Sequence, residues 1–156
     1  MKNYAEFLEF SDQPYVIYKD DRIVYHTTGE KVSNDIKRSG FKTGKELDIS
    51  EKRDAIYFSD LSVNPGMYAR NREDEIYHGQ EIGTVPINIK GLKLLNMNYK
   101  KDGIFVHHKK YNNFVIGGEL DKLPKCDGSI SFLKDGRIYE VALRKETANK
   151  LLITKF

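Results

Sequence analysis

The chain of 156 residues contains a single cysteine, four prolines and no long apolar stretch. The lone thiol, Cys126, excludes a disulfide within the chain and favours a reducing compartment. No run approaches the ~20 apolar residues that a membrane-spanning helix needs. The first ten residues include Glu6 and Glu9, which is not the pattern of a signal peptide. These absences predict a soluble, cytoplasmic protein that does not enter a membrane.

Several common site motifs are also missing. The chain has no Gly-x-Gly-x-x-Gly or Walker loop, so a nucleotide would not be bound by a Rossmann fold. It has no Gly-x-Ser-x-Gly elbow, and no metal is expected from the spacing of its candidate ligands. Those ligands are His78, His107, His108 and Cys126. Basic pairs at Lys100-Lys101 and Lys109-Lys110 are more typical of a solvated surface than of a nucleic-acid interface.

What is present describes one globular domain. Hydrophobic residues make up 39% and charged residues 31% of the chain, with a net charge of +3. At this length one core forms, so a single domain is expected over residues 1–156. The small positive charge permits an acidic partner or a nucleotide without requiring one.

Short β-prone runs dominate the chain. Alternation of Val85, Ile87 and Ile89 predicts a half-buried strand that ends before Gly91. Asp135-Gly136 predicts a hairpin with a two-residue type I′ turn, and Lys19-Asp20-Asp21 suggests another between its flanking runs. The expected strands are Tyr15–Tyr18, Arg22–Tyr25, Ala55–Phe58, Thr84–Lys90, Leu92–Met97, Ile104–His107, Phe114–Ile116, Ser129–Leu133 and Arg137–Leu143. Many short strands with few helices predict an α+β domain with a mostly antiparallel sheet.

A helix is expected directly after the second of these runs. Thr27 and Glu30 have the spacing of a capping box, and Gly40 is a good residue to end the helix. Val32 and Ile36 are spaced to share one side of it. Thr27 is therefore a candidate helix cap as well as a candidate ligand contact, and a helix N-terminus also presents N–H groups to anions.

Two tyrosines flank a turn in the middle of the chain. Tyr57 lies in the run Ile56-Tyr57-Phe58-Ser59-Asp60, and Tyr68 follows the turn at Asn64-Pro65-Gly66. Two such rings can form the walls of a slot for a flat ring, because offset stacking contributes about 0.5–1.5 kcal/mol beyond burial. The alternative is that both are ordinary half-buried tyrosines of a β-rich domain.

These residues resemble a known family. Ile56–Asp60 with Tyr68 is similar to the nicotinamide-binding segment of the poly(ADP-ribose) polymerase-like ADP-ribosyltransferases, the clade with a His-Tyr-Glu signature. Tyr25-His26-Thr27-Thr28 resembles the family's histidine strand, although the family has glycine where this chain has Thr27. Glu140 is the candidate for the family's late acidic residue.

The resemblance implies a fold, a co-substrate and a set of site residues. The fold would be a split, mostly antiparallel sheet, and the co-substrate would be NAD, with release of nicotinamide. His26, Tyr57 and Glu140 would be catalytic. ADP-ribose would pass to a macromolecular acceptor, with a protein favoured over a nucleic acid, or to water. The residues that would contact NAD are His26, Thr27, Thr28, Tyr57, Ser59 and Tyr68.

Glu140 is also notable from the sequence itself. It is the only acid in the apolar run Ile138–Leu143, and an ionised carboxylate is buried only with partners, so it faces solvent or serves a site. Strict alternation would place it on one side with Ile138 and Ala142, and Tyr139, Val141 and Leu143 on the other. Asp135 is the competing acid, but its place before Gly136 is explained by turn formation.

Two other functions remain open. An RNA 2′-phosphotransferase shares the fold and also consumes NAD, but that family carries arginines near its histidine and Tyr25–Gly29 contains none. A domain of this fold could also bind a partner without catalysis, since a fold does not establish an activity. Likewise, a histidine that ends an apolar strand is commonly structural, and His26 could be so.

Overall fold

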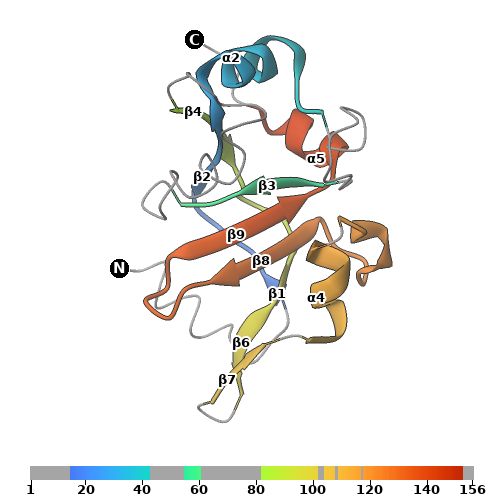
Figure 1. Cartoon of the computed structure of the whole chain (residues 1–156). Coiled ribbons are helices and arrows are strands. Elements are labelled where there is room, and N and C mark those ends of the chain that lie inside the picture. Colours follow the sequence, from blue (N-terminus) through green and yellow to red (C-terminus); the bar gives the residue numbers. More distant parts are fainter. Residues whose placement is uncertain are drawn as a thin grey trace.

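The computed structural model describes residues 15–42, 55–60, 82–101, 104–107, 109–116 and 118–152. Tyr68, His78 and His108 lie outside these residues. Within them the chain is an α+β protein with mostly antiparallel strand pairs and few helices, as predicted (Figure 1). The strands are β1 (Tyr15–Val16), β2 (Ile23–Gly29), β3 (Ile56–Phe58), β4 (Ile82–Asn88), β5 (Leu94–Asn96), β6 (Asn98–Lys101), β7 (Ile104–His107), β8 (Gly128–Phe132) and β9 (Ile138–Leu143). The helices are α2 (Glu30–Ser39), α4 (Lys109–Ile116), α5 (Lys145–Lys150) and the 3-10 turn η2 (Leu120–Lys122).

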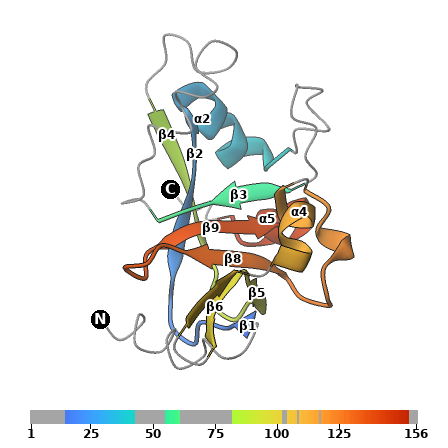
Figure 2. The same ribbon diagram turned by 60° about the horizontal axis from the view of Figure 1, so that its bottom comes forward.

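The main sheet has five strands in the order β1-β5-β8-β9-β3, and only the β5–β8 pair is parallel. Two further ladders, β2–β4 and β6–β7, are antiparallel. β2 meets the end of β3 through a two-bond bridge between Tyr25 and Ser59, with N–O distances of 2.8 and 2.9 Å. Figures 1 and 2 both show β2 and β4 crossing the strands β3, β9 and β8 at a steep angle.

Apolar residues pack on both sides of the main sheet. Alternate residues of β9 enter different clusters: Val141 and Leu143 join the first, and Ala142 joins the second. The first cluster also contains Ile36 of α2 and Ala148 of α5, and the second contains Val115 of α4. In Figure 2, α4 accordingly lies in front of β8 and β9, with α5 behind them. We call these clusters the first core and the second core.

The alternating pattern of β4 is confirmed. Val85, Ile87 and Ile89 are all fully buried in the first core. The predicted break at Gly91 is also confirmed, since this residue has a φ of +81°, which disfavours residues with a Cβ.

The expected hairpin between Tyr15–Tyr18 and Arg22–Tyr25 is wrong. β1 pairs with β5, whereas β2 pairs with β4. The chain that joins β4 to β5 comes between the two runs: Ile89 N–H donates to the carbonyl of Arg22, and Gly91 N–H donates to that of Tyr18, both at 2.9 Å. Sequence neighbours that read as a hairpin are therefore each paired with a later strand.

The predicted capping box at Thr27 is also wrong. β2 continues to Gly29, with Thr27 opposite Thr84 and Thr28 opposite Gly83, so both threonines are in strand conformation. α2 begins at Glu30, and Gly29 caps it without a side-chain hydrogen bond. The predicted end of the helix is confirmed, because Gly40 has a φ of +89° and its N–H bonds the carbonyl of Ile36 at 2.7 Å.

The run Phe114–Ile116, expected to be a strand, lies in α4. Tyr111, Phe114 and Val115 have i, i+3 and i+4 spacing, which is the helical period. Val115 is buried in the second core, and Tyr111 and Phe114 pack against it. Three apolar residues in a row were too short a run to distinguish the two structures.

The β8–β9 hairpin is confirmed, but its turn is not type I′. Leu133 N–H bonds the carbonyl of Arg137, and Gly136 N–H bonds that of Leu133, both at 2.9 Å. Gly136 has a φ of +91°. These features describe a three-residue loop, in which a turn is followed by a left-handed glycine.

Candidate functional site

Tyr57 and Glu140 lie on one side of adjacent strands. Tyr57 of β3 is opposite Ala142 of β9, and both belong to or pack against the second core. Glu140 precedes Ala142 by two residues, so its side chain is on the same side as Tyr57. Residues on this diagonal of an antiparallel pair are about 7–8 Å apart. The register thus places Tyr57 and Glu140, which are distant in the sequence, on one side of neighbouring strands.

A β-bulge immediately precedes Glu140. Ser131 of β8 is opposite Glu140, but its neighbour Phe132 is opposite Ile138, so Tyr139 has no partner in β8. Ile138 is therefore in the first core with Val141, and Tyr139 is 39% exposed. The alternation predicted for this strand is wrong at these two residues, because one extra residue reverses the pattern. It is correct from Glu140 onward.

The ring of Tyr57 is half-buried, and its hydroxyl has a structural partner. The hydroxyl donates to the carbonyl oxygen of Val115 in α4 at 2.9 Å. That carbonyl is near the end of the helix, where main-chain oxygens lack partners within the helix. Tyr57 therefore links α4 to the main sheet by a hydrogen bond, in addition to any role in a site.

His26 approaches β3 from the other side. Its ring packs edge-on against Phe41 and Phe58, with centroid distances of 5.5 and 5.8 Å, and Phe58 belongs to the first core. Its Nδ1 lies 2.7 Å from the carbonyl oxygen of Tyr57. A carbonyl only accepts hydrogen bonds, so the proton is on Nδ1, and in the neutral ring Nε2 is the acceptor nitrogen. His26 thus contacts the main chain of Tyr57, while its ring lies on the opposite side of β3 from the Tyr57 side chain.

Of the other residues that the resemblance implies, Thr28 and Ser59 have buried side chains. Thr28 is 1% and Ser59 3% exposed, whereas Thr27 is half-buried. Continuing the β3–β9 register beyond Phe58 and Val141 places Ser59 beside Glu140. Tyr68, the expected second wall of a nicotinamide slot, lies outside the described residues.

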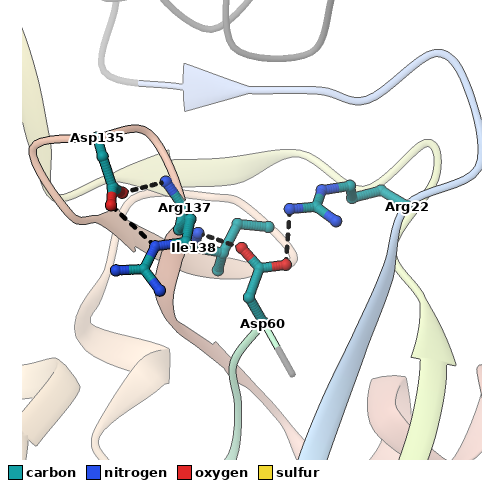
Figure 3. A network of polar contacts seen from close by, with 5 residues as sticks. All are labelled: Arg22, Asp60, Asp135, Arg137 and Ile138. Carbon is teal, nitrogen blue, oxygen red and sulfur yellow. Dashed lines mark hydrogen bonds and ion pairs between the residues drawn. The ribbon is translucent and has the colours of Figure 1, made fainter. Parts of the chain in front are cut away.

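A buried polar cluster next to these residues was not predicted. Asp60 accepts a hydrogen bond from Nη2 of Arg22 at 2.7 Å and another from the N–H of Ile138 at 2.5 Å (Figure 3). Burial raises the pKa of the neighbouring Tyr18 hydroxyl to about 12, and the positive charge of Arg22 partly offsets this effect. In the sequence, Asp60 was noted only as the last residue of the run Ile56–Asp60. An acid two residues after the apolar run Ile56–Phe58 was the available signal.

The carboxylate of Asp135, the competing acid, forms hydrogen bonds within the turn. Its carboxylate accepts the N–H of Arg137 at 3.1 Å and pairs with Nε of the same residue at 2.9 Å (Figure 3). The main-chain hydrogen bond from Arg137 is the largest of the effects that lower the pKa of Asp135 below its ordinary value. The predicted turn role of Asp135 is confirmed.

Comparisons of the chain with protein-family models, with curated proteins and with solved structures found no match. A function is therefore inferred from the arrangement of this chain's own residues.

The described residues also bear on metal binding and on membrane insertion. No three histidine, cysteine, aspartate or glutamate side chains lie together there in a way that could hold a metal ion. Within the same residues, none of the helices has the length and apolar character needed to cross a membrane.

Proposed function

We propose that this protein is an NAD-dependent ADP-ribosyltransferase, which transfers ADP-ribose to a macromolecular acceptor and releases nicotinamide. The supporting observation is that Tyr57 and Glu140 lie on the same side of the adjacent strands β3 and β9. The sequence alone also identifies both residues as candidates. A protein acceptor is favoured over a nucleic acid, because the basic pairs in the sequence are typical of a solvated surface.

The arrangement suits the charge that develops in this reaction. As the bond to nicotinamide breaks, the ribose becomes oxocarbenium-like, and the nicotinamide leaves as a neutral ring. A carboxylate fixed beside the ribose stabilises that cation, and such preorganised electrostatics are commonly the largest catalytic contribution. Glu140 would supply the carboxylate, and the ring of Tyr57 would stack on nicotinamide.

The other implied residues have supporting roles in this proposal. Because the ring of His26 lies on the other side of β3 from Tyr57, we assign it no contact with nicotinamide. It would instead orient the adenosine-side ribose, which is remote from the reacting bond. Thr28 and Ser59 are buried, and the main-chain N–H and C=O of Ser59 both bond Tyr25, so we assign these two residues no direct contact with NAD.

Nicotinamide release tests the proposal directly. The purified protein is incubated with NAD, with and without a cell lysate, and nicotinamide is measured by chromatography. Labelled NAD followed by mass spectrometry identifies the acceptor. We expect release that requires Glu140, with label transferred to protein. Release that is equal in the Glu140→Gln variant, or no release under any condition, would contradict the proposed function.

A non-catalytic domain that binds a partner is the second candidate. It is favoured by one observation, the bond from the Tyr57 hydroxyl to the carbonyl of Val115, which gives this tyrosine a structural reason to be present. The two candidates differ in whether NAD binds at all. Calorimetric titration with NAD should give a measurable affinity for the enzyme and none for the non-catalytic domain.

A further inference from the structure

Asp60 holds Ile138 at two points. Its N–H donates to the carbonyl oxygen of Ile138 at 3.2 Å, and its carboxylate Oδ2 accepts the N–H of Ile138 at 2.5 Å. The carboxylate occupies the place that a main-chain carbonyl would take if β3 continued alongside β9. Asp60 is 8% exposed and Ile138 is fully buried, so water does not compete strongly for these bonds.

The other oxygen of this carboxylate holds Arg22. The distance from Asp60 Oδ1 to Arg22 Nη2 is 2.7 Å. Because the two oxygens serve different partners, Arg22 does not form the two-bond fork that is common between guanidinium and carboxylate groups. Its Nε is buried and has no hydrogen-bond partner in the described part of the chain. A buried donor without a partner is unfavourable. The carboxylate thus bonds Ile138 with the oxygen that could have given Arg22 a second hydrogen bond.

Ile138, the residue that Asp60 binds, lies at the bulge that precedes Glu140. Tyr139 is the extra residue of the bulge. Ile138 comes directly before Tyr139, and Glu140 comes directly after Tyr139. Figure 3 shows that Asp135 binds the neighbouring N–H of Arg137, so two successive N–H groups at the start of β9 each bond a carboxylate. Bulges bend a strand locally and re-aim the side chains beside them. The direction of Glu140 therefore depends on where Ile138 is fixed.

We propose that Asp60 is a positioning residue for Glu140. By holding Ile138, it fixes the bulge at Tyr139 and so the direction of the Glu140 carboxylate, while Arg22 holds Asp60 in place. The catalytic part of this inference rests on the proposed function. The structural part, that Asp60 controls the surroundings of Glu140, does not depend on it.

The first test observes the carboxyl group of Glu140 without NAD. Glutamate carboxyl carbons are labelled with ¹³C, and the Glu140 signal is identified by its loss in Glu140→Gln. In Asp60→Asn the amide cannot satisfy both partners, because an oxygen turned to Ile138 turns the NH₂ donor toward Arg22. We expect the Glu140 signal and its titration midpoint to shift, and the Ile138 amide to exchange faster.

The matched control is Asp121→Asn. Asp121 also pairs with an arginine, Arg144, at 2.9 Å, but its side chain is 94% exposed and it lies on η2. Its replacement should leave both the Glu140 signal and the exchange of Ile138 unchanged. A folded Asp60→Asn protein with the Glu140 signal and midpoint of the wild type would overturn the proposal.

The second test is a double-mutant cycle on nicotinamide release. We expect Asp60→Asn to lower kcat about 10²-fold, since a small displacement of a catalytic group has effects of this size, with little change in KM. The Asp60→Asn/Glu140→Gln double variant should be no slower than Glu140→Gln alone, because Asp60 acts through Glu140. Losses that multiply in the double variant would overturn this role.

The two tests separate the failure of each proposal. A wild-type protein without nicotinamide release contradicts the proposed function, and the carbon signal of Glu140 then decides the role of Asp60. Should Asp60→Asn not fold, Asp60→Glu keeps the charge for Arg22 but moves the carboxylate by one methylene relative to Ile138. The same shift of the Glu140 signal is expected there, and its absence contradicts the inference.

Discussion

The Nδ1 atom of His26 lies 2.7 Å from the carbonyl oxygen of Tyr57, so one candidate site residue is hydrogen bonded to the main chain of another. This bond lies beside the isolated bridge between Tyr25 and Ser59, since His26 follows Tyr25 and Tyr57 precedes Ser59 by two residues. The His26 side chain thus donates a hydrogen bond to the main-chain carbonyl of Tyr57 at the point where β2 and β3 part. His26 has a structural role whether or not NAD binds.

The first prediction follows from these contacts of His26. The His26→Ala substitution removes the bond to Tyr57 and two edge-on contacts with Phe41 and Phe58, and should lower the free energy of unfolding by about 1–3 kcal/mol. Urea denaturation measures this change. The ¹⁵N shifts of the wild-type ring at pH 8.5 should report a proton on Nδ1. An Nε2–H tautomer would contradict the hydrogen bond described here.

The second prediction separates the two roles of Tyr57. Tyr57→Phe removes only the bond to Val115, so stability should fall by about 0.5–1.5 kcal/mol while NAD affinity is unchanged. Tyr57→Ala also removes the ring and should weaken NAD binding by about 1–3 kcal/mol. Urea denaturation and calorimetry of both variants measure these effects. Equal NAD affinity in a folded Tyr57→Ala protein would exclude stacking by this residue.

The third prediction concerns the acid that stabilises the oxocarbenium ion. Glu140→Gln keeps the shape of the side chain but removes its charge, so turnover should fall by roughly 10²–10³. NAD affinity should stay within a few-fold, because the interaction is made mainly in the transition state. Single-turnover kinetics and calorimetry measure the two quantities.

Asp135→Asn is the control for Glu140. Its carboxylate is exposed and serves the turn through Arg137, so turnover should remain close to that of the wild type. A large loss in Asp135→Asn together with a small one in Glu140→Gln would assign the catalytic acid to Asp135 instead.

The fourth prediction concerns stability at alkaline pH. Burial raises the pKa of Tyr18 to about 12 in the folded protein, against about 10 when unfolded. Above pH 10 the unfolded chain releases this proton first, so stability is full below pH 10 and falls as the pH rises toward 12. The difference corresponds to roughly 2–3 kcal/mol.

Urea denaturation at pH 8 and pH 11 measures this loss. Tyr18→Phe should lose less stability between these two pH values than the wild type. Tyr139→Phe replaces an exposed ring and should lose as much as the wild type. A Tyr18→Phe protein with the same alkaline loss as the wild type would show that Tyr18 does not cause it.

Local patterns in the sequence were enough to determine several elements. Val85, Ile87 and Ile89 alternate because a strand turns successive side chains to opposite sides, and all three are buried. Gly40 ends α2 at the predicted residue, since a positive φ there favours glycine. The strand that carries Tyr57, the β8–β9 hairpin and the α+β class depend on similar short-range preferences. Glu140 was also recognised as unusual in its strand from its neighbours alone.

Only the tertiary structure decided which segments meet. The pairing of β1 with β5 and of β2 with β4 depends on the chain between β4 and β5, which is distant in sequence from both runs that appeared to form a hairpin. The bulge at Tyr139 and the bonds from Asp60 to Ile138 likewise join residues that are separated in the sequence. The energies of such contacts come from partners brought together by folding. Patterns of neighbouring residues in the sequence therefore do not predict these contacts. For this reason the sequence could select Tyr57 and Glu140, but only the folded sheet puts them on one side.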